Sequence, residues 1–226
     1  MRWTIRPRVI DRIRLRHAAL SYSEHGWDVT PGACLSGARF TCERPGCPTT
    51  GCHPALERWE DAATCDIMRV AGWWRARPHT VLFATGRAFD VLEVPAHLGL
   101  RGLGLARLHG HVLGPTRVRV RGPIAVTPTG RWMFLVRPGD PLRRELDDQL
   151  DVVHHGPGSW VPAPPSRLPE GPVHWVVSPA EARWELPDSY AVQALLVDAL
   201  AVAPPRLGVP VPPDVPRQVS TARRAA

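Results

Sequence analysis

The chain has 226 residues, enough for one domain with a substantial core, and carries a formal net charge of +7 at pH 7. All 28 of its basic residues are arginine, and the net positive charge weakly favours a polyanionic partner such as nucleic acid. No segment has the roughly 20 apolar residues of a membrane span, and no apolar run follows the basic N-terminus as it does in a signal peptide. The composition therefore predicts a soluble cytoplasmic protein without a membrane partner.

The first half of the chain alternates between helical and strand patterns. Apolar residues at helical spacing predict a first helix that ends at Gly26, and Thr64 or Asp66 is the expected N-terminal cap of a second helix. Two β-prone runs separated by Gly86 and Arg87 are predicted to be neighbouring strands. In chain order, a helix, a strand, a helix and these two strands are expected over 10–25, 27–30, 64–74, 80–85 and 88–94.

The second half is predicted to end in a helix that is capped near Asp188. A hairpin is expected around the turn at 127–130. His154 and His155 precede a Gly-Pro-Gly sequence, which favours a turn over a pair of metal ligands. In chain order, a helix, two hairpin strands, a short helix, three short strands and the last helix are expected over 96–109, 123–126, 132–136, 141–150, 152–153, 160–161, 175–177 and 189–201.

The mixed order of helices and strands predicts an α+β domain with a mainly antiparallel sheet over residues 1–203. The high proline content and the lack of periodic apolar residues predict a flexible Pro/Arg-rich tail over 204–226. In the Arg-Val-Arg-Val-Arg sequence at 117–121, alternation would place the arginines on one strand face. That face would be either a solvated edge or a groove that follows phosphates.

Four of the five cysteines and a histidine lie in the loop 34–53. Thiolate and imidazole groups at short spacings, with Gly and Pro bending the chain, favour a tetrahedral structural Zn²⁺ site. The alternatives are a disulfide pair or reduced thiols that bind nothing. Because nothing in the sequence points to an oxidising compartment, zinc is favoured over a disulfide.

A series of short motifs occurs in one order over roughly residues 15–180. The motifs are Cys47-Pro48-x-x-Gly51-x-His53-Pro54, Trp59-x-Asp61-Ala62-Ala63-Thr64, Trp73-Trp74-x-x-x-Pro78, Ala84-Thr85-Gly86, Asp90-Val91-Leu92-Glu93-Val94, Thr127-Pro128-x-Gly130 and Ala163-Pro164-Pro165-Ser166. Together they resemble the N-terminal prim-pol domain of bifunctional DNA primase/polymerases, in the archaeo-eukaryotic primase superfamily, and most of all its short stand-alone actinobacterial versions. The resemblance implies an RRM-like palm with a mainly antiparallel sheet, flanking helices and a zinc-binding loop insertion.

The resemblance also implies which acids would be catalytic. In the family, carboxylates on adjacent strands hold two divalent ions, Mg²⁺ or Mn²⁺, for nucleotidyl transfer. Glu93 stands in the place of the first acid and Pro95 in the place of the second, so Asp90 and Asp151 are the remaining candidates. On a regular strand Asp90 and Glu93 would point to opposite faces, and they could share a metal only across a bulge. With so few anionic oxygens, activity is expected to be weak or absent.

Phosphate contacts are implied by the motif that begins at Thr127. Arg131 and Thr129 lie in this motif and are candidate phosphate-binding residues, with Arg87 as a further candidate. Trp132 stands about where the family has a histidine.

The resemblance also reduces the number of candidate zinc ligands. Cys42, Cys47 and His53 match the family pattern best, with the spacing C-x4-C-x5-H. Either Cys34 or Cys52 could be the fourth ligand. Cys34 is preferred, because adjacent Cys52 and His53 could hardly both bind one tetrahedral ion without strain.

The resemblance predicts a primase/polymerase-type protein whose template-directed nucleotidyl transfer is weak or lost. Its expected partners are a DNA or RNA template, nucleotides, and a helicase or other replication protein. The alternative is a catalytically inactive descendant that binds nucleic acid or a protein, which the replaced acid and histidine favour. An accessory regulator with no nucleic-acid role is a third possibility, and it would show no salt-sensitive DNA binding.

Overall fold

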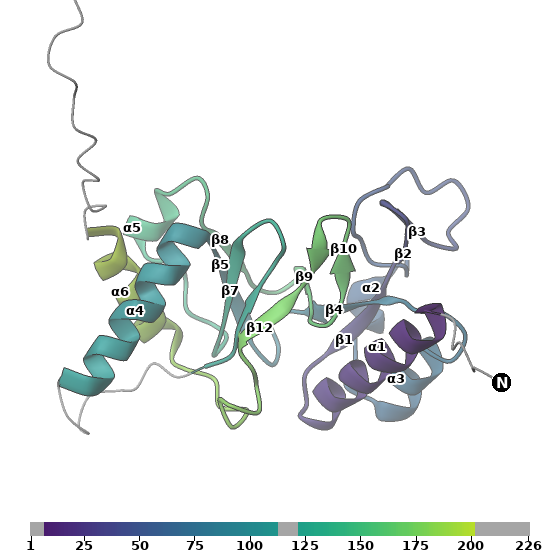
Figure 1. Cartoon of the computed structure of the whole chain (residues 1–226), viewed down its shortest axis with the longest axis horizontal. Helices are drawn as coiled ribbons and strands as arrows, with labels where there is room; N and C mark the ends of the chain where they lie inside the picture. Colours follow the sequence, from purple (N-terminus) through teal and green to yellow (C-terminus); the bar gives the residue numbers. More distant parts are fainter. Residues whose placement is uncertain (1–6, 113–121, 202–226) are drawn as a thin grey trace, which may run out of the picture.

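The computed structural model describes residues 7–112 and 122–201, which form a mixed α/β structure with antiparallel sheets. Figure 1 shows helices at the two ends of the long axis and strands between them. The arginine repeat at 117–121 and the predicted tail at 204–226 lie outside the described residues. No helix within the described ranges is long and apolar enough to cross a lipid bilayer.

One end of the molecule is built on a three-stranded antiparallel sheet in the order β1-β4-β9. Helices α1 and α3 contact each other and pack on this sheet. Two small hairpins, β2-β3 and β10-β11, lie beside it (Figure 1). The bounds are α1 Pro7–Glu24, β1 Val29–Gly32, β2 Cys34–Ser36, β3 Arg39–Thr41, α2 Trp59–Ala62, α3 Ile67–Trp73, β4 Thr80–Ala84, β9 Trp160–Pro162, β10 Arg167–Leu168 and β11 Gly171–Pro172.

The other end is built on a five-stranded antiparallel sheet in the order β12-β6-β7-β5-β8. Helices α4 and α6 pack against each other and cover one face of this sheet. The bounds are β5 Asp90–Pro95, α4 Ala96–Val112, β6 Ile124–Val126, β7 Arg131–Val136, α5 Arg144–Asp147, β8 Val153–His155, β12 His174–Val177 and α6 Ser189–Ala201.

Several predicted element ends are confirmed, because each depends on a local signal. Helix α1 ends just before Gly26, which has φ +76° and so adopts the left-handed conformation that glycine allows without a steric penalty. The Asp66 side chain caps α3 by accepting a hydrogen bond from Arg69 N at 2.8 Å. Asp188 caps α6 in the same way, with Ala191 N as the donor at 3.1 Å.

The prediction that the runs at 80–85 and 88–94 are neighbouring strands is wrong. Strand β4 has β1 on one edge and β9 on the other, while β5 has β7 and β8, so neither strand has a free edge for the other. Between them the chain turns at Gly86, whose φ is +97° and whose N–H donates to Phe89 O at 2.8 Å. The two runs therefore enter different sheets.

Two further predictions in the second half need correction. The helix expected over 141–150 is a single turn, α5, in which only Leu146 is buried, so there is no apolar face to support a longer helix. His154 and His155 are not in a turn but end strand β8, because they pair with Leu92 and Val91 of β5.

The two faces of the five-stranded sheet pack into different cores. Because side chains alternate along a strand, Val91 and Met133 join the core that contains Trp27 and Phe83, beside the three-stranded sheet. Leu92, Val94, Trp132 and Phe134 face the other way, into the core formed with α4 and α6. This division decides which polar side chains on β5 can meet.

Candidate functional site

Glu93, on β5, is held by two basic side chains from the neighbouring strands. Arg131 Nε, from β7, donates to Glu93 Oε1 at 2.7 Å, and His155 Nε2, from β8, donates to Oε2 at 2.8 Å. The other imidazole nitrogen, Nδ1, lies 2.8 Å from Ser159 Oγ. These groups form a continuous hydrogen-bonded chain across three strands.

The strand register explains why these side chains share one face. Glu93 lies opposite Met133 on β7 and Val153 on β8, while Arg131 lies opposite Pro95. Residues two apart on a strand share a face, so Glu93, Arg131 and His155 all point to the side of the sheet away from α4 and α6. The sequence analysis did not predict a role for His155 at this site. A strand continuing from Val153 would have placed His155 on the same face as Val153, which lies opposite Glu93.

The two partners of Glu93 lower the pKa of its carboxyl by more than its burial raises it. Burial acts to raise the pKa of the Glu93 carboxyl, but the hydrogen bonds and charges of His155 and Arg131 together hold this pKa below its ordinary value. The side chain is 20% exposed, so solvent reaches the pair only partly. Glu93 is therefore a carboxylate whose oxygens are already satisfied at neutral pH.

Asp90 lies on the opposite face of β5. Its Oδ2 accepts hydrogen bonds from His154 Nε2 at 3.1 Å and from Gly139 N at 3.2 Å, while its buried Oδ1 has no hydrogen-bond partner among the described residues. The pairing of β5 with β7 runs without interruption from residue 90 to 95, so no bulge brings Asp90 and Glu93 to one side. The structure does not bring these two acids together.

The other predicted site residues have separate partners. Asp151 has an exposed side chain, and it is its backbone carbonyl that accepts from Arg131 Nη2, at 2.7 Å. Arg87 pairs with the buried Asp28, with Nε 3.2 Å from Oδ2. Thr129 Oγ1 lies 2.9 Å from Thr127 Oγ1 in the β6-β7 turn.

Trp132 does not face Glu93 at all. Its register partner is Val94, so it points into the core with α4, where Gly99 leaves room for its ring. The only imidazole hydrogen-bonded to Glu93 among the described residues is that of His155, which comes from a different strand.

A pair of divalent ions does not fit the groups around Glu93. Its cross-strand neighbours are Met133 and Val153, and the next residue on its face of β5 is Pro95, none of which offers a side-chain oxygen. Two hard cations need several anionic oxygens close together. Among the described residues, Glu93 belongs to no group of three or more His, Cys, Asp or Glu side chains whose ligand atoms lie within 4.8 Å of one another.

A metal ion such as zinc fits the cysteine loop better. The ligand atoms of Cys42, Cys47 and His53 all lie within 4.8 Å of one another, the only such group in the part of the chain that the structure describes. His53 Nδ1–H donates to Gly51 O at 2.7 Å, which leaves Nε2 free of a proton and 3.5 Å from Cys47 Sγ. A backbone carbonyl commonly orients a zinc-bound imidazole in this way.

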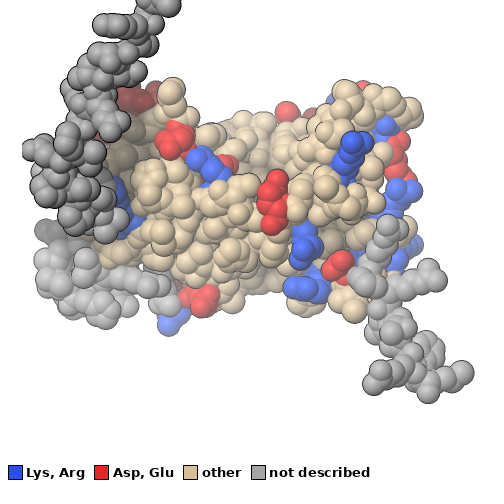
Figure 2. Space-filling view, turned by 45° about the horizontal axis from the view of Figure 1, so that its top comes forward, with Lys and Arg blue, Asp and Glu red and all other residues tan. Residues whose placement is uncertain are grey.

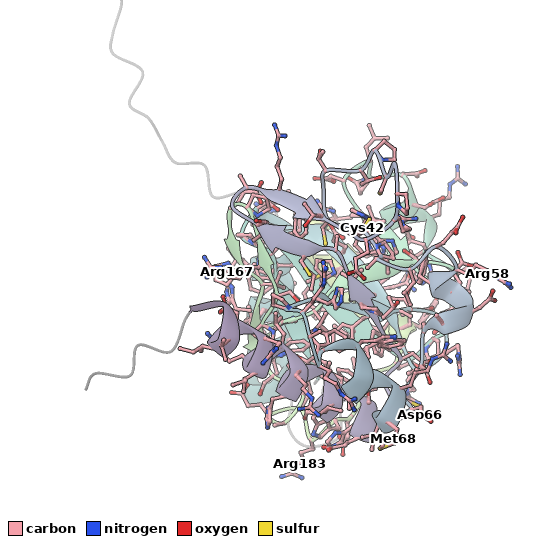
Figure 3. The ribbon with its side chains drawn as sticks, turned by 90° about the vertical axis from the view of Figure 1, so that its right-hand side faces the viewer. Cys42, Arg58, Asp66, Met68, Arg167 and Arg183 are labelled. Carbon is pink, nitrogen blue, oxygen red and sulfur yellow. The ribbon has the colours of Figure 1, made fainter. Side chains whose placement is uncertain are left out.

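Charge near the loop favours the thiolate that a metal needs. Although its slight burial acts to raise the pKa of Cys42, hydrogen bonds from the backbone and side chain of Arg44 lower it overall. Arg44 Nη2 also donates to Cys47 Sγ at 3.4 Å. Figure 3 shows Cys42 within this loop.

Neither candidate for the fourth ligand belongs to the group. Cys34 Sγ lies 3.6 Å from His79 Nδ1, in β2 rather than in the tip of the loop. Burial raises the pKa of the Cys52 thiol to about 12, and its Sγ is not among the ligand atoms that lie within 4.8 Å of one another. The structure therefore supplies three protein ligands.

Comparison with known proteins identifies the family of this chain. The family model for the N-terminal domain of bifunctional DNA primase/polymerases, Prim-Pol, matches residues 19–189, well over half of the chain. Searches of curated proteins and of solved structures returned no significant match. The match covers the three-stranded sheet, the cysteine loop and the Glu93 site together, and the chain therefore belongs to the Prim-Pol family.

Proposed function

We propose that this chain is a Prim-Pol domain that binds nucleic acid or nucleotides but does not perform two-metal nucleotidyl transfer. Family membership suggests binding of nucleic acid and nucleotides and a primase/polymerase ancestry. The five-stranded antiparallel sheet, with α4 and α6 on one face, supports its assignment as the RRM-like palm of that family. A helicase or other replication partner remains a prediction of the resemblance.

This proposal rests on one observation, the hydrogen bonding of the Glu93 carboxylate. Its two oxygens are occupied by Arg131 and His155, and Asp90 lies on the far side of the sheet. A metal ion at Glu93 would have to displace both hydrogen bonds, and the Asp90 carboxylate could not join it from the opposite face of the sheet. Catalysis by Glu93, Asp90 and Asp151 around shared Mg²⁺ or Mn²⁺ would require a rearranged strand.

Arg131 supports a phosphate-binding role at the same place. Its Nε and Nη2 groups are engaged, but its Nη1 has no hydrogen-bond partner among the described residues, and the side chain is 24% exposed. A guanidinium held rigidly with donors to spare suits a phosphate oxygen. Thr129 offers a second polar group in the adjoining turn, where its hydroxyl lies 2.9 Å from Thr127 Oγ1.

The zinc loop is assigned a structural role in this proposal. Cys42, Cys47 and His53 would hold the ion, which would stabilise a loop that has only the short β2-β3 hairpin as regular structure.

Two assays on the full chain test the proposal. Fluorescence anisotropy with a labelled single-stranded DNA oligomer should show binding that weakens steeply with salt. Primer extension with Mn²⁺ should show no product. Arg131→Ala should weaken binding, whereas Arg137→Ala, at an exposed arginine just beyond β7, should not. Extension that disappears in Glu93→Ala would overturn the loss of catalysis, and absence of salt-sensitive binding would overturn the binding role.

A further inference from the structure

A cavity of about 530 Å³ lies apart from both sites described above. It is lined by residues of α1, of the β2-β3 turn, of the β10-β11 hairpin and of the start of β12, and none of them belongs to the Glu93 site or the zinc group. Its volume is in the range of small-ligand sites. The cavity is therefore large enough for a nucleotide.

One wall of the cavity is apolar and rigid. Trp175 lines it, and its indole Nε1–H donates to Tyr22 Oη at 3.2 Å. Tyr22 Oη–H in turn donates to Pro164 O at 2.6 Å, so the buried Tyr22 ties the indole to the Pro164-Pro165 segment that also lines the cavity. A fixed indole flanked by prolines suits a planar aromatic ring, as in stacking platforms for nucleobases.

The rim of the cavity carries positive charge. Arg14, on α1, and Arg167, on β10, line the cavity and are exposed, and neither has an ion-pair partner among the described residues. Figure 3 shows Arg167 beside α1, and Figure 2 shows basic side chains, with some acidic ones between them, on the half of the molecule that carries α1.

The charges of the lining add up to a net positive site. The single carboxylate in the lining is Asp11, one turn before Arg14 on α1. The formal charge of the two arginines and Asp11 is thus +1, which favours an anion. Asp11 can accept a hydrogen bond from an amino or hydroxyl group, which is the type of donor that nucleotides present.

We propose that this cavity binds a nucleotide, with its base against Trp175 and the prolines and its phosphate on Arg14 and Arg167. The inference rests on the proposed function, since it names a binding site for the ligand class that the family suggests. The same chemistry is presented by a free nucleotide and by one unit of a single-stranded nucleic acid.

The test uses the double variant Arg14→Ala/Arg167→Ala of the full chain. Both side chains are exposed and unpaired in the described structure, so the variant should fold normally. Arg16→Ala is the matched control, because Arg16 lies on the same helix, is exposed and does not line the cavity. Binding of a fluorescein-labelled oligo(dT) is measured over a salt series, with unlabelled dATP as competitor.

The double variant should bind at least about tenfold more weakly than the wild type. The slope of log K against log salt should also fall by about 0.7, since both arginines contact one phosphate and each neutralised phosphate of a single strand contributes about 0.7. Displacement of the oligomer by dATP at this site assigns the cavity to free nucleotides as well as to single strands, and resistance to dATP assigns it to single strands alone.

The outcomes separate this inference from the proposed function. If the double variant binds the oligomer with wild-type affinity and slope while Arg131→Ala weakens binding, the cavity proposal is wrong and the proposed function stands. If the wild type binds neither the oligomer nor dATP, both are wrong.

Discussion

Replacing Glu93 with glutamine tests whether its charge stabilises the folded protein. Glutamine has nearly the same shape, and its carbonyl can still accept from Arg131 Nε, so Glu93→Gln removes the charge while keeping most of the packing. In the structure this charge receives two hydrogen bonds, of 2.7 Å and 2.8 Å, from side chains that are 24% and 16% exposed.

The expected cost follows from the difference between charged and neutral hydrogen bonds. A bond to a charged group contributes about 1.5–3 kcal/mol to stability, against about 0.5–1.5 kcal/mol for a neutral one. Because the site is partly exposed, screening by solvent makes the loss for the two bonds smaller than the full sum of these differences. The free energy of unfolding should therefore fall by about 1–2 kcal/mol at pH 7.

The loss should also depend on pH in a defined direction. Because the pKa of Glu93 is lowered in the folded protein, its contribution is fully present above the unfolded pKa of about 4.3 and declines as pH falls through the folded value. The difference in unfolding free energy between wild type and Glu93→Gln should thus shrink as the pH falls below about 4. Comparing the two proteins at each pH cancels any acid release of metal from the cysteine loop.

Urea unfolding of the full chain, followed by tryptophan fluorescence, provides the measurement. Glu57→Gln is the control, because Glu57 is exposed and makes no hydrogen bond or ion pair in the described structure, so it should change stability by less than about 0.5 kcal/mol. Equal stability of Glu93→Gln and wild type at pH 7, or a difference that does not vary with pH, would show that the charge of Glu93 is not stabilised as described.

Two further predictions concern packing and metal binding. Gly99→Ala should destabilise the protein by about 1–3 kcal/mol, because its new Cβ would lie 2.4 Å from Trp132 Cγ, whereas Gly104→Ala in the same helix meets nothing within 4 Å and should be neutral or stabilising by up to about 1 kcal/mol. Thermal unfolding of both variants checks this, and a Gly99→Ala protein as stable as Gly104→Ala would contradict the packing of Trp132 against α4. The purified protein should contain about one zinc ion per chain by elemental analysis, Cys42→Ala should lose it, and Cys65→Ala, outside the ligand group, should keep it. Retention of a full equivalent by Cys42→Ala would disprove the assigned ligands, and removal of the ion by a chelator should lower the unfolding temperature.

Predictions from the sequence succeeded where a few adjacent residues decide the structure. The end of α1 before Gly26 depends on backbone freedom. The caps of α3 by Asp66, one of the two expected candidates with Thr64, and of α6 by Asp188 depend on hydrogen bonds within one helical turn. The pairing of β4 and β5 failed for the opposite reason. Each strand takes partners from segments far along the chain, and short apolar runs carry no signal for which partner they choose.

The candidate metal group was predicted from the sequence only in part. Cys42, Cys47 and His53 are close in the chain, so their spacing already limits the distance between their ligand atoms. Which of Cys34 and Cys52 would complete the group depends on tertiary packing. Cys34 meets His79, 45 residues away, and neither its Sγ nor that of the half-buried Cys52 lies within 4.8 Å of the other three ligand atoms.

For the Glu93 site, the amino-acid sequence by itself determined that Asp90 and Glu93 point to opposite faces, because side chains alternate along any regular strand. The resemblance to the family also predicted that Pro95 stands in the place of the second acid. Only the tertiary structure decided that Glu93 accepts hydrogen bonds from Arg131 and His155, which lie 38 and 62 residues further along the chain. That outcome depends on the order and register of three strands, which are set by the packing of the whole sheet between its two cores.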